Sequence, residues 1–140
     1  MINGKTVFIV GAGASEEAGL PIGSKLAQSI AGLLDIKFRH GYEQFSGSYQ
    51  ISAALRAFVN SAGSDDINPY LHAGRAIRDA APLALSIDNF IDAHRGDKGI
   101  ELCGKLAISQ AILRAEQGSK LHFDQNKGQR LDTPHLADTW

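Results

Sequence analysis

A short apolar run that leads directly into glycines constrains the fold more than any other feature of the sequence. The run Thr6 to Val10 is rich in β-branched residues and is followed at once by Gly11 and Gly13. A continuous apolar run bounded by glycine is typical of a strand that is buried on both faces of a parallel sheet. We therefore expect an α/β fold in which many helices accompany a Rossmann-like parallel sheet.

Composition excludes several other classes of protein. The 140 residues are 44% hydrophobic and 21% charged, which fits one globular domain or part of one. The net charge of −1 gives no electrostatic case for binding nucleic acid or an anionic membrane surface. No apolar run approaches the ~20 residues that a membrane span needs. The single cysteine, Cys103, excludes an internal disulfide and a cysteine-rich zinc site, so we expect no metal site and a cytoplasmic location.

The remainder of the sequence predicts helices more than strands. A short helix capped by Ser15 should end at Gly19 to Pro21, and residues 35–48 are expected to be loop. Ser64 or Asp65 can cap the third of the longer helices, and Asp97 can cap the last, in which Cys103 belongs to a buried row. Apolar residues recur at helical spacing in five longer segments: about 24–34, 51–61, 66–80, 86–94 and 97–117.

One predicted strand among so many helices raises a question about the extent of the domain. A buried parallel strand needs neighbours for its backbone groups, and Leu121 to Phe123 is the one later strand-like run. Either the remaining strands follow Trp140, or some later strands have been read as helix. We favour the first explanation, in which residues 1–140 form the N-terminal part of a single domain and 118–140 form a polar, turn-rich tail.

The glycine loop has the context of a phosphate site. In Gly11-x-Gly13 the first glycine permits a tight turn and the second lets the backbone approach a pyrophosphate at a helix N-terminus. Glu16 stands where the dinucleotide fingerprint has its third glycine. No Gly-Lys-Ser/Thr follows the glycine loop, since Gly4-Lys5-Thr6 precedes the strand-like run, and this excludes a nucleoside-triphosphate P-loop. Ser15 lacks the second glycine of a nucleophile elbow.

The segment GAGASEEAGLP, from Gly11 to Pro21, resembles the NAD-binding loop of the sirtuins, Gly-Ala-Gly-x-Ser-x-x-Ser/Ala-Gly-Ile/Leu-Pro. The segment SIDNFIDAH, from Ser86 to His94, is similar to the divergent sirtuin-like domains of bacterial antiphage-defence proteins. This resemblance implies NAD as the bound cofactor and an NAD glycohydrolase that cleaves nicotinamide from ADP-ribose. The chain departs from deacetylating sirtuins at Ile22 to Ser24, and it lacks their four-cysteine zinc module.

Cofactor-binding residues follow from the resemblance, whereas catalytic residues do not. Asp88 and Asn89 either face a ribose or serve as first-turn caps beside Ser86. The catalytic segment is expected beyond Trp140. Two weaker candidates within the chain are Asn126, which follows a glutamine as in the family, and His94, a candidate general base. The full set of expected cofactor-binding residues is Gly11, Ala12, Gly13, Ala14, Ser15, Gly19, Pro21, Asp88 and Asn89.

Other functions remain open beside the hydrolase. The chain could be a non-catalytic sensor module that binds NAD or ADP-ribose, or a helical interaction fragment that self-associates or pairs with the C-terminal remainder of a longer protein. A flavin- or NAD-dependent oxidoreductase is disfavoured because Glu16 interrupts the fingerprint and no second strand ends in an acidic residue.

Overall fold

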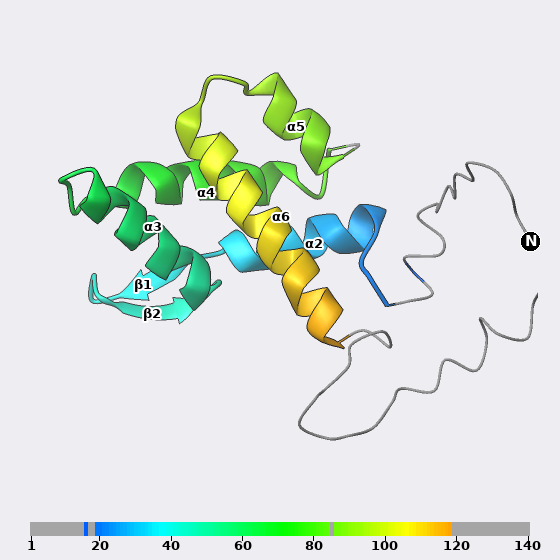
Figure 1. Cartoon of the computed structure of the whole chain (residues 1–140), viewed down its shortest axis with the longest axis horizontal. Coiled ribbons are helices and arrows are strands. Elements are labelled where there is room, and N and C mark those ends of the chain that lie inside the picture. The colour runs from blue at the N-terminus through cyan, green and yellow to red at the C-terminus, as the bar shows by residue number, and fades with distance from the viewer. Residues whose placement is uncertain (1–15, 17–18, 85, 119–140) are drawn as a thin grey trace, which may run out of the picture.

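The computed structural model describes residues 16, 19–84 and 86–118 (Figure 1). The expected strand at Thr6 to Val10 and the loop from Gly11 to Ser15 lie outside the described residues, so the parallel sheet stays a prediction. The described ranges are helix-rich, as expected. Their elements are α2 (Gly23–Leu34), β1 (Lys37–Arg39), β2 (Glu43–Ser46), α3 (Tyr49–Ser61), α4 (Asn68–Ala80), α5 (Ile87–Ala93) and α6 (Lys98–Gly118).

All five longer helices predicted from apolar spacing are present. In three of them a side chain caps the N-terminus. In α3 the Ser48 Oγ accepts a hydrogen bond from the Ile51 amide at 3.3 Å. In α5 the Ser86 Oγ accepts one from the Asn89 amide at 3.1 Å. The predicted cap of α6 is confirmed, because Asp97 Oδ1 accepts from two first-turn amides at 2.9 and 3.0 Å. These bonds satisfy amides that have no partner within the helix.

The start of α4 differs from the prediction. Neither Ser64 nor Asp65 caps it: the cap position is Ile67, whose side chain makes no cap bond. Instead the Asp66 carboxylate accepts a hydrogen bond from the Asn68 amide at 2.9 Å. Pro69 occupies the first turn, where a missing amide hydrogen costs nothing. The prediction was wrong because several capping residues stand together here, and the turn geometry decides among them.

The prediction of loop at residues 35–48 is also wrong. β1 and β2 form an antiparallel hairpin with a register irregularity between Lys37 and Phe38. His40, at φ 54°, and Gly41, at φ 80°, make the turn between them. The strands have only three and four residues, too short for a clear alternation of apolar and polar side chains. The one buried residue of β2 is polar: Gln44 accepts a hydrogen bond from Ser52 Oγ at 2.5 Å.

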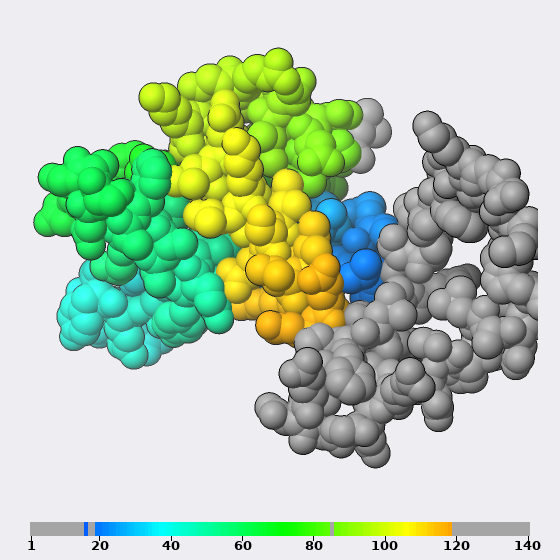
Figure 2. Space-filling model, in the orientation of Figure 1, coloured from blue at the N-terminus to red at the C-terminus, as the bar shows by residue number. Residues whose placement is uncertain are grey.

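The core forms between helices, with α6 in the middle. Figure 1 shows α6 crossing α2 and α4, with α3 and the hairpin on one side and α5 near its first turns. α6 contacts α2, α3, α4 and α5. The predicted row on α6 is buried, and Cys103 and Ala107 are 0% exposed. Figure 2 shows the outer surface of α6, where Leu113 is 57% exposed.

An ion-pair network ties α4 to the end of α2. Arg78 Nη1 lies 2.8 Å from Asp35 Oδ1, and Lys37 Nζ lies 2.9 Å from Asp35 Oδ2. The hydrogen bond from Lys37, reinforced by that from Arg78, lowers the pKa of Asp35 below its usual value. Bonds to Asp79 and Asp35 raise the pKa of Arg78 further above neutral pH. One carboxyl oxygen of Asp35 therefore joins the end of α2 to α4, and the other joins it to the first residue of β1.

Candidate functional site

The end of the sirtuin-like segment turns directly into α2. The Gly19 amide donates a hydrogen bond to the Glu16 carbonyl at 2.9 Å, and Gly19 adopts φ +89°. A left-handed glycine of this kind is the usual way for a helix to end. Pro21 and the extended residue Ile22 follow, and α2 begins at Gly23. Gly19 and Pro21 therefore lie immediately before α2, whereas the predicted contacts Gly11, Ala12, Gly13, Ala14 and Ser15 lie outside the described residues.

A cavity of about 290 Å³ lies between the first turns of α2 and α5; we refer to it as the α2–α5 cavity. The chain between α4 and α5 closes one side of it. Its walls combine apolar side chains with a few polar ones. Residues that line it include Ser24, Leu26, Gln28, Pro82, Ile87 and Asp88.

Asp88 is the predicted site residue that reaches the α2–α5 cavity. It is exposed, and its carboxylate makes no hydrogen bond or ion pair with any other described residue. Asn89 does not line the cavity, and its amide serves the Ser86 cap. The structure therefore places Asp88 beside α2, the helix that follows Gly19 and Pro21. Asp88 lines the cavity, whereas Asn89 takes part in the cap of α5.

The catalytic candidates lie away from this cavity or outside the described part of the chain. His94 follows α5 at the end opposite Asp88, where its Nδ1 lies 2.8 Å from the Phe90 carbonyl oxygen. Its ring packs on Phe90 with centroids 4.3 Å apart. His94 lines neither of the two cavities described in this section. Asn126 lies outside the described residues, so its predicted role is untested.

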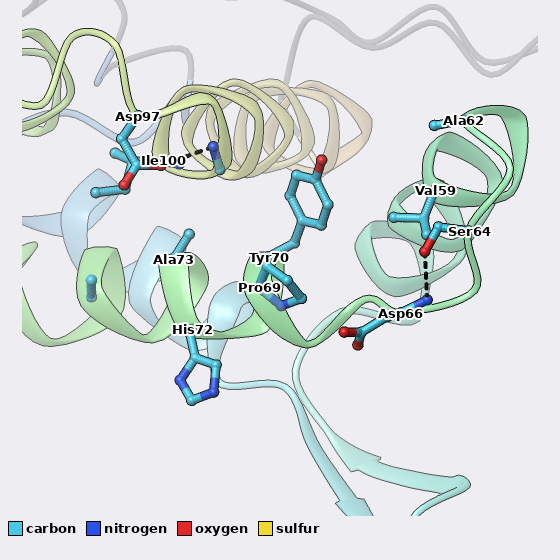
Figure 3. Close-up of a pocket in the computed structure, with 12 residues that line it drawn as sticks. Val59, Ala62, Ser64, Asp66, Pro69, Tyr70, His72, Ala73, Asp97 and Ile100 are labelled. Atoms are coloured by element: carbon cyan, nitrogen blue, oxygen red, sulfur yellow. Dashed lines mark hydrogen bonds between the residues drawn. The ribbon is translucent and has the colours of Figure 1, made fainter.

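A larger cavity of about 640 Å³ lies at the other end of α4; we refer to it as the α3–α6 groove (Figure 3). The end of α3, the connection to α4, the first half of α4 and the start of α6 enclose it. Val59 and Ile100 are among its lining residues, although only 3% and 5% of their surface is exposed. Gly99 permits close packing, because a Cβ there would lie 3.1 Å from the Ala73 Cβ.

Two carboxylates lie at opposite ends of the α3–α6 groove, with Tyr70 between them (Figure 3). Asp66 Oδ1 accepts hydrogen bonds from the amide and side chain of Asn68 at 2.9 and 2.8 Å. Asp97 Oδ1 accepts the cap bonds of α6. The second oxygen of each carboxylate has no partner among the described residues, and His72 of α4 also lines the groove.

The sequence did not predict this groove. Asp97 was assigned to capping alone, which accounts for one of its two oxygens. Val59 and Ile100 belong to helices that pack together only in the tertiary structure. The available signal was an acidic residue at the start of each of two helices, and such residues are common at helix N-termini without any ligand.

The described residues form neither a metal centre nor a reactive thiol site. Within residues 16, 19–84 and 86–118, no three His, Cys, Asp or Glu side chains are grouped to hold a metal ion. Burial, with a contribution from the Asp97 charge, raises the pKa of the Cys103 thiol to about 11. Its Sγ donates to the Tyr70 carbonyl at 3.2 Å, so Cys103 is a core residue, as predicted.

Comparisons of the chain with protein-family models, curated proteins and solved structures give no match in any of the three. None of the helices in the described ranges is long and apolar enough to cross a membrane.

Proposed function

We propose that this chain is the NAD-binding portion of a sirtuin-like NAD⁺ glycohydrolase, which cleaves NAD to nicotinamide and ADP-ribose. The proposal starts from the resemblance of residues 11–21 to the sirtuin loop. It includes a role in antiphage defence, because the segment from Ser86 to His94 is similar to sirtuin-like defence proteins. A Rossmann-like sheet that begins at Thr6 to Val10 and a cytoplasmic location are parts of the same proposal.

The position of Asp88 is the observation that carries the proposal. Asp88 lines a cavity together with Ser24 and Gln28 of α2, the helix that directly follows Gly19 and Pro21. The second segment that resembles sirtuin-like domains thus lies beside α2, the helix that follows the first, although the sequence separates them widely. A structural role for Asp88 alone would not require this juxtaposition.

The side chains of the α2–α5 cavity suit part of a nucleotide. A carboxylate accepts hydrogen bonds from a ribose diol, and the Ser24 hydroxyl and Gln28 amide offer donors and acceptors beside it. Leu26 and Ile87 offer apolar surface for a base or a nicotinamide ring. A volume of about 290 Å³ holds a nucleoside-sized group and not a whole dinucleotide. We assign the pyrophosphate to the loop from Gly11 to Ser15, where backbone amides would donate to it.

Binding without hydrolysis is the second candidate, and the position of His94 favours it. His94 stands at the other end of α5 from Asp88 and bonds the Phe90 carbonyl. No described residue of the α2–α5 cavity is a histidine that could activate water. If the catalytic segment lies outside these 140 residues, the chain alone binds NAD and releases little or no nicotinamide.

Calorimetric titration of the full chain with NAD and with ADP-ribose tests the proposal. We expect saturable binding that Asp88→Ala weakens by about tenfold, because a charge-assisted hydrogen bond to the ribose is lost. Asp92→Asn, an exposed carboxylate elsewhere on α5, is the matched control and should bind as the parent does. Chromatography of the reaction mixture measures released nicotinamide.

The outcomes separate the three functions. Saturable binding without nicotinamide release supports the sensor module, and release that Asn126→Ala abolishes places catalysis within the chain. Absence of NAD and ADP-ribose binding by the folded chain refutes both NAD-based functions. Self-association in that case, measured by analytical ultracentrifugation, supports the helical interaction fragment.

A further inference from the structure

We propose that α6 is the contact surface of a symmetric dimer, in which two copies of the chain pair antiparallel through the outward side of this helix. The surface is one row of side chains, which we call the outer α6 row. Its members are Lys98, Leu102, Leu106, Ser109, Leu113 and Glu116. No member of the row lines the α2–α5 cavity, so the dimer neither requires nor implies NAD binding.

The outer α6 row follows the spacing of a helix–helix contact. Its four central members, from Leu102 to Leu113, are separated by four, three and four residues. Residues at this spacing form one stripe along a helix, as in the seam of a coiled coil. The buried row from Ile100 to Ala111 occupies another side of the same helix. α6 is therefore apolar on two sides, and the other described elements fully bury only one of them.

The exposure of its leucines shows that the second side is open. Leu113 is 57% exposed, and Leu102 and Leu106 are partly buried at the margin of the core. α6 lies at the surface of the described structure (Figure 2). Phe58, which is 47% exposed, adds apolar surface next to α6, because α3 contacts α6 and the Phe58 ring packs on Tyr70. Apolar side chains gathered on one exposed face are typical of an interaction surface.

The two ends of the outer α6 row carry opposite charges. Lys98 begins the row and Glu116 ends it, 18 residues later. That separation is about five helical turns, or about 27 Å, so the two side chains lie on one side of α6 but cannot pair with each other. Both residues are exposed, and neither forms an ion pair with another described residue. The row therefore fits a partner that carries the same charges in the reverse order.

A second copy of α6 in antiparallel orientation supplies that order. Lys98 of each copy then lies against Glu116 of the other copy, and the two-fold axis forms this pair twice. Between the two pairs, Leu102 of each copy faces Leu113 of the other, so both leucines lose contact with water. A parallel pair would gather both lysines at one end and both glutamates at the other. Charge therefore selects the antiparallel dimer.

Sedimentation equilibrium of the full chain without NAD, over a wide range of concentration, tests the proposal. We expect a reversible equilibrium between monomer and dimer. Leu113→Glu should weaken the dimer at least about thirtyfold, because a carboxylate replaces an apolar contact twice in each dimer. Leu83→Glu changes a leucine that is 88% exposed and lies outside α6. This matched control should dimerise as the parent does.

Charge reversal tests the direction of pairing. Lys98→Glu and Glu116→Lys should each weaken the dimer by about fivefold at low ionic strength, since both ion pairs become repulsions. The double variant exchanges the signs, restores both pairs and should recover the parent affinity. An equimolar mixture of the two single variants should form a heterodimer more tightly than either forms a homodimer. Both changes favour the helix dipole, so α6 should stay folded, which circular dichroism checks.

Several results would overturn the proposal. One is a parent chain that stays monomeric at every concentration. In that case thermal melting identifies what covers the row: Leu113→Glu that melts below Leu83→Glu indicates another segment of the same chain, and equal melting indicates water. A dimer that Leu113→Glu does not weaken uses another surface. A dimer that the double charge variant does not restore relative to the single variants is not antiparallel through α6.

Discussion

Gly104 of α6 lies against Ile91 of α5 so closely that a Cβ at residue 104 would be 2.9 Å from Ile91 Cγ1 and closer still to Cδ1. Glycine normally weakens a helix interior by roughly 0.5–1 kcal/mol relative to alanine. Here the absence of a side chain allows α5 to pack on α6.

The first prediction concerns this contact. Gly104→Ala should lower the free energy of unfolding by about 1–3 kcal/mol, because Ile91 must move out of its packed position. Gly32→Ala in α2 is the matched control: a Cβ there meets nothing within 4 Å, so the change should raise stability by about 0.5–1 kcal/mol. Urea denaturation measures both. A stabilised Gly104→Ala variant would contradict the packing of α5 described above.

The second prediction uses two glycines of positive φ around the hairpin. Gly41 and Gly47 have φ of 80° and 75°, so alanine is strained at both, by about 1–2 kcal/mol. A Cβ at residue 47 would also lie 2.7 Å from Ile36 Cα, whereas one at residue 41 meets nothing within 4 Å. Gly47→Ala should therefore destabilise the protein by at least about 1 kcal/mol more than Gly41→Ala. Equal urea midpoints for the two variants would show that Ile36 moves aside without a cost in stability.

The third prediction is a pH dependence that originates at Asp35. The folded-state pKa of Asp35 is below its unfolded value of 3.8, so the unfolded chain binds more protons near that pH. The resulting stability is present above pH 3.8 and is lost as the pH falls through the folded-state pKa. Asp35→Asn should cost about 0.5–1 kcal/mol at neutral pH and less in acid.

Denaturation series at several pH values measure the effect at Asp35. Asp92→Asn, which removes an exposed ion pair with Arg95, should leave the free energy of unfolding nearly unchanged. If the destabilisation by Asp35→Asn stays constant down to acidic pH, the ion pairs of Asp35 with Lys37 and Arg78 do not stabilise the fold.

The fourth prediction concerns alkaline pH. The thiol of Cys103 has a pKa of about 11 in the folded chain and an ordinary value of 9.0 when exposed. Unfolding then releases a proton between these pH values, so the free energy of unfolding falls as the pH rises, by at most about 3 kcal/mol. Comparison with Cys103→Ala isolates this term from the titration of other groups. If the difference in stability between the two proteins is constant from neutral to strongly alkaline pH, titration of Cys103 does not contribute to the pH dependence.

Local signals in the sequence were sufficient to predict the helices. The apolar spacing that predicts α6 depends on residues of one turn and the next, and Asp97 caps the helix through its own neighbours. The hairpin escaped prediction because β1 and β2 are stabilised by each other and by the polar contact of Gln44 with Ser52, not by a local pattern.

The sites were predictable only in part. Asp88 was identified from a resemblance, and its position beside Ser24 depends on how α5 packs near α2. The α3–α6 groove depends on distant helices, as its buried residues Val59 and Ile100 illustrate. No rule of sequence spacing brings such residues together, because their separation along the chain sets no distance in space.

The burial of Cys103 has a practical consequence for spectroscopy. It is the one cysteine of the sequence, it is 0% exposed, and its thiol stays protonated at neutral pH. A cysteine introduced on the surface will therefore react far faster with a maleimide dye or spin label than the native one. Labels near Ser64 and near Leu83, one beside each cavity, would report on the two ends of α4 separately without a cysteine-free background.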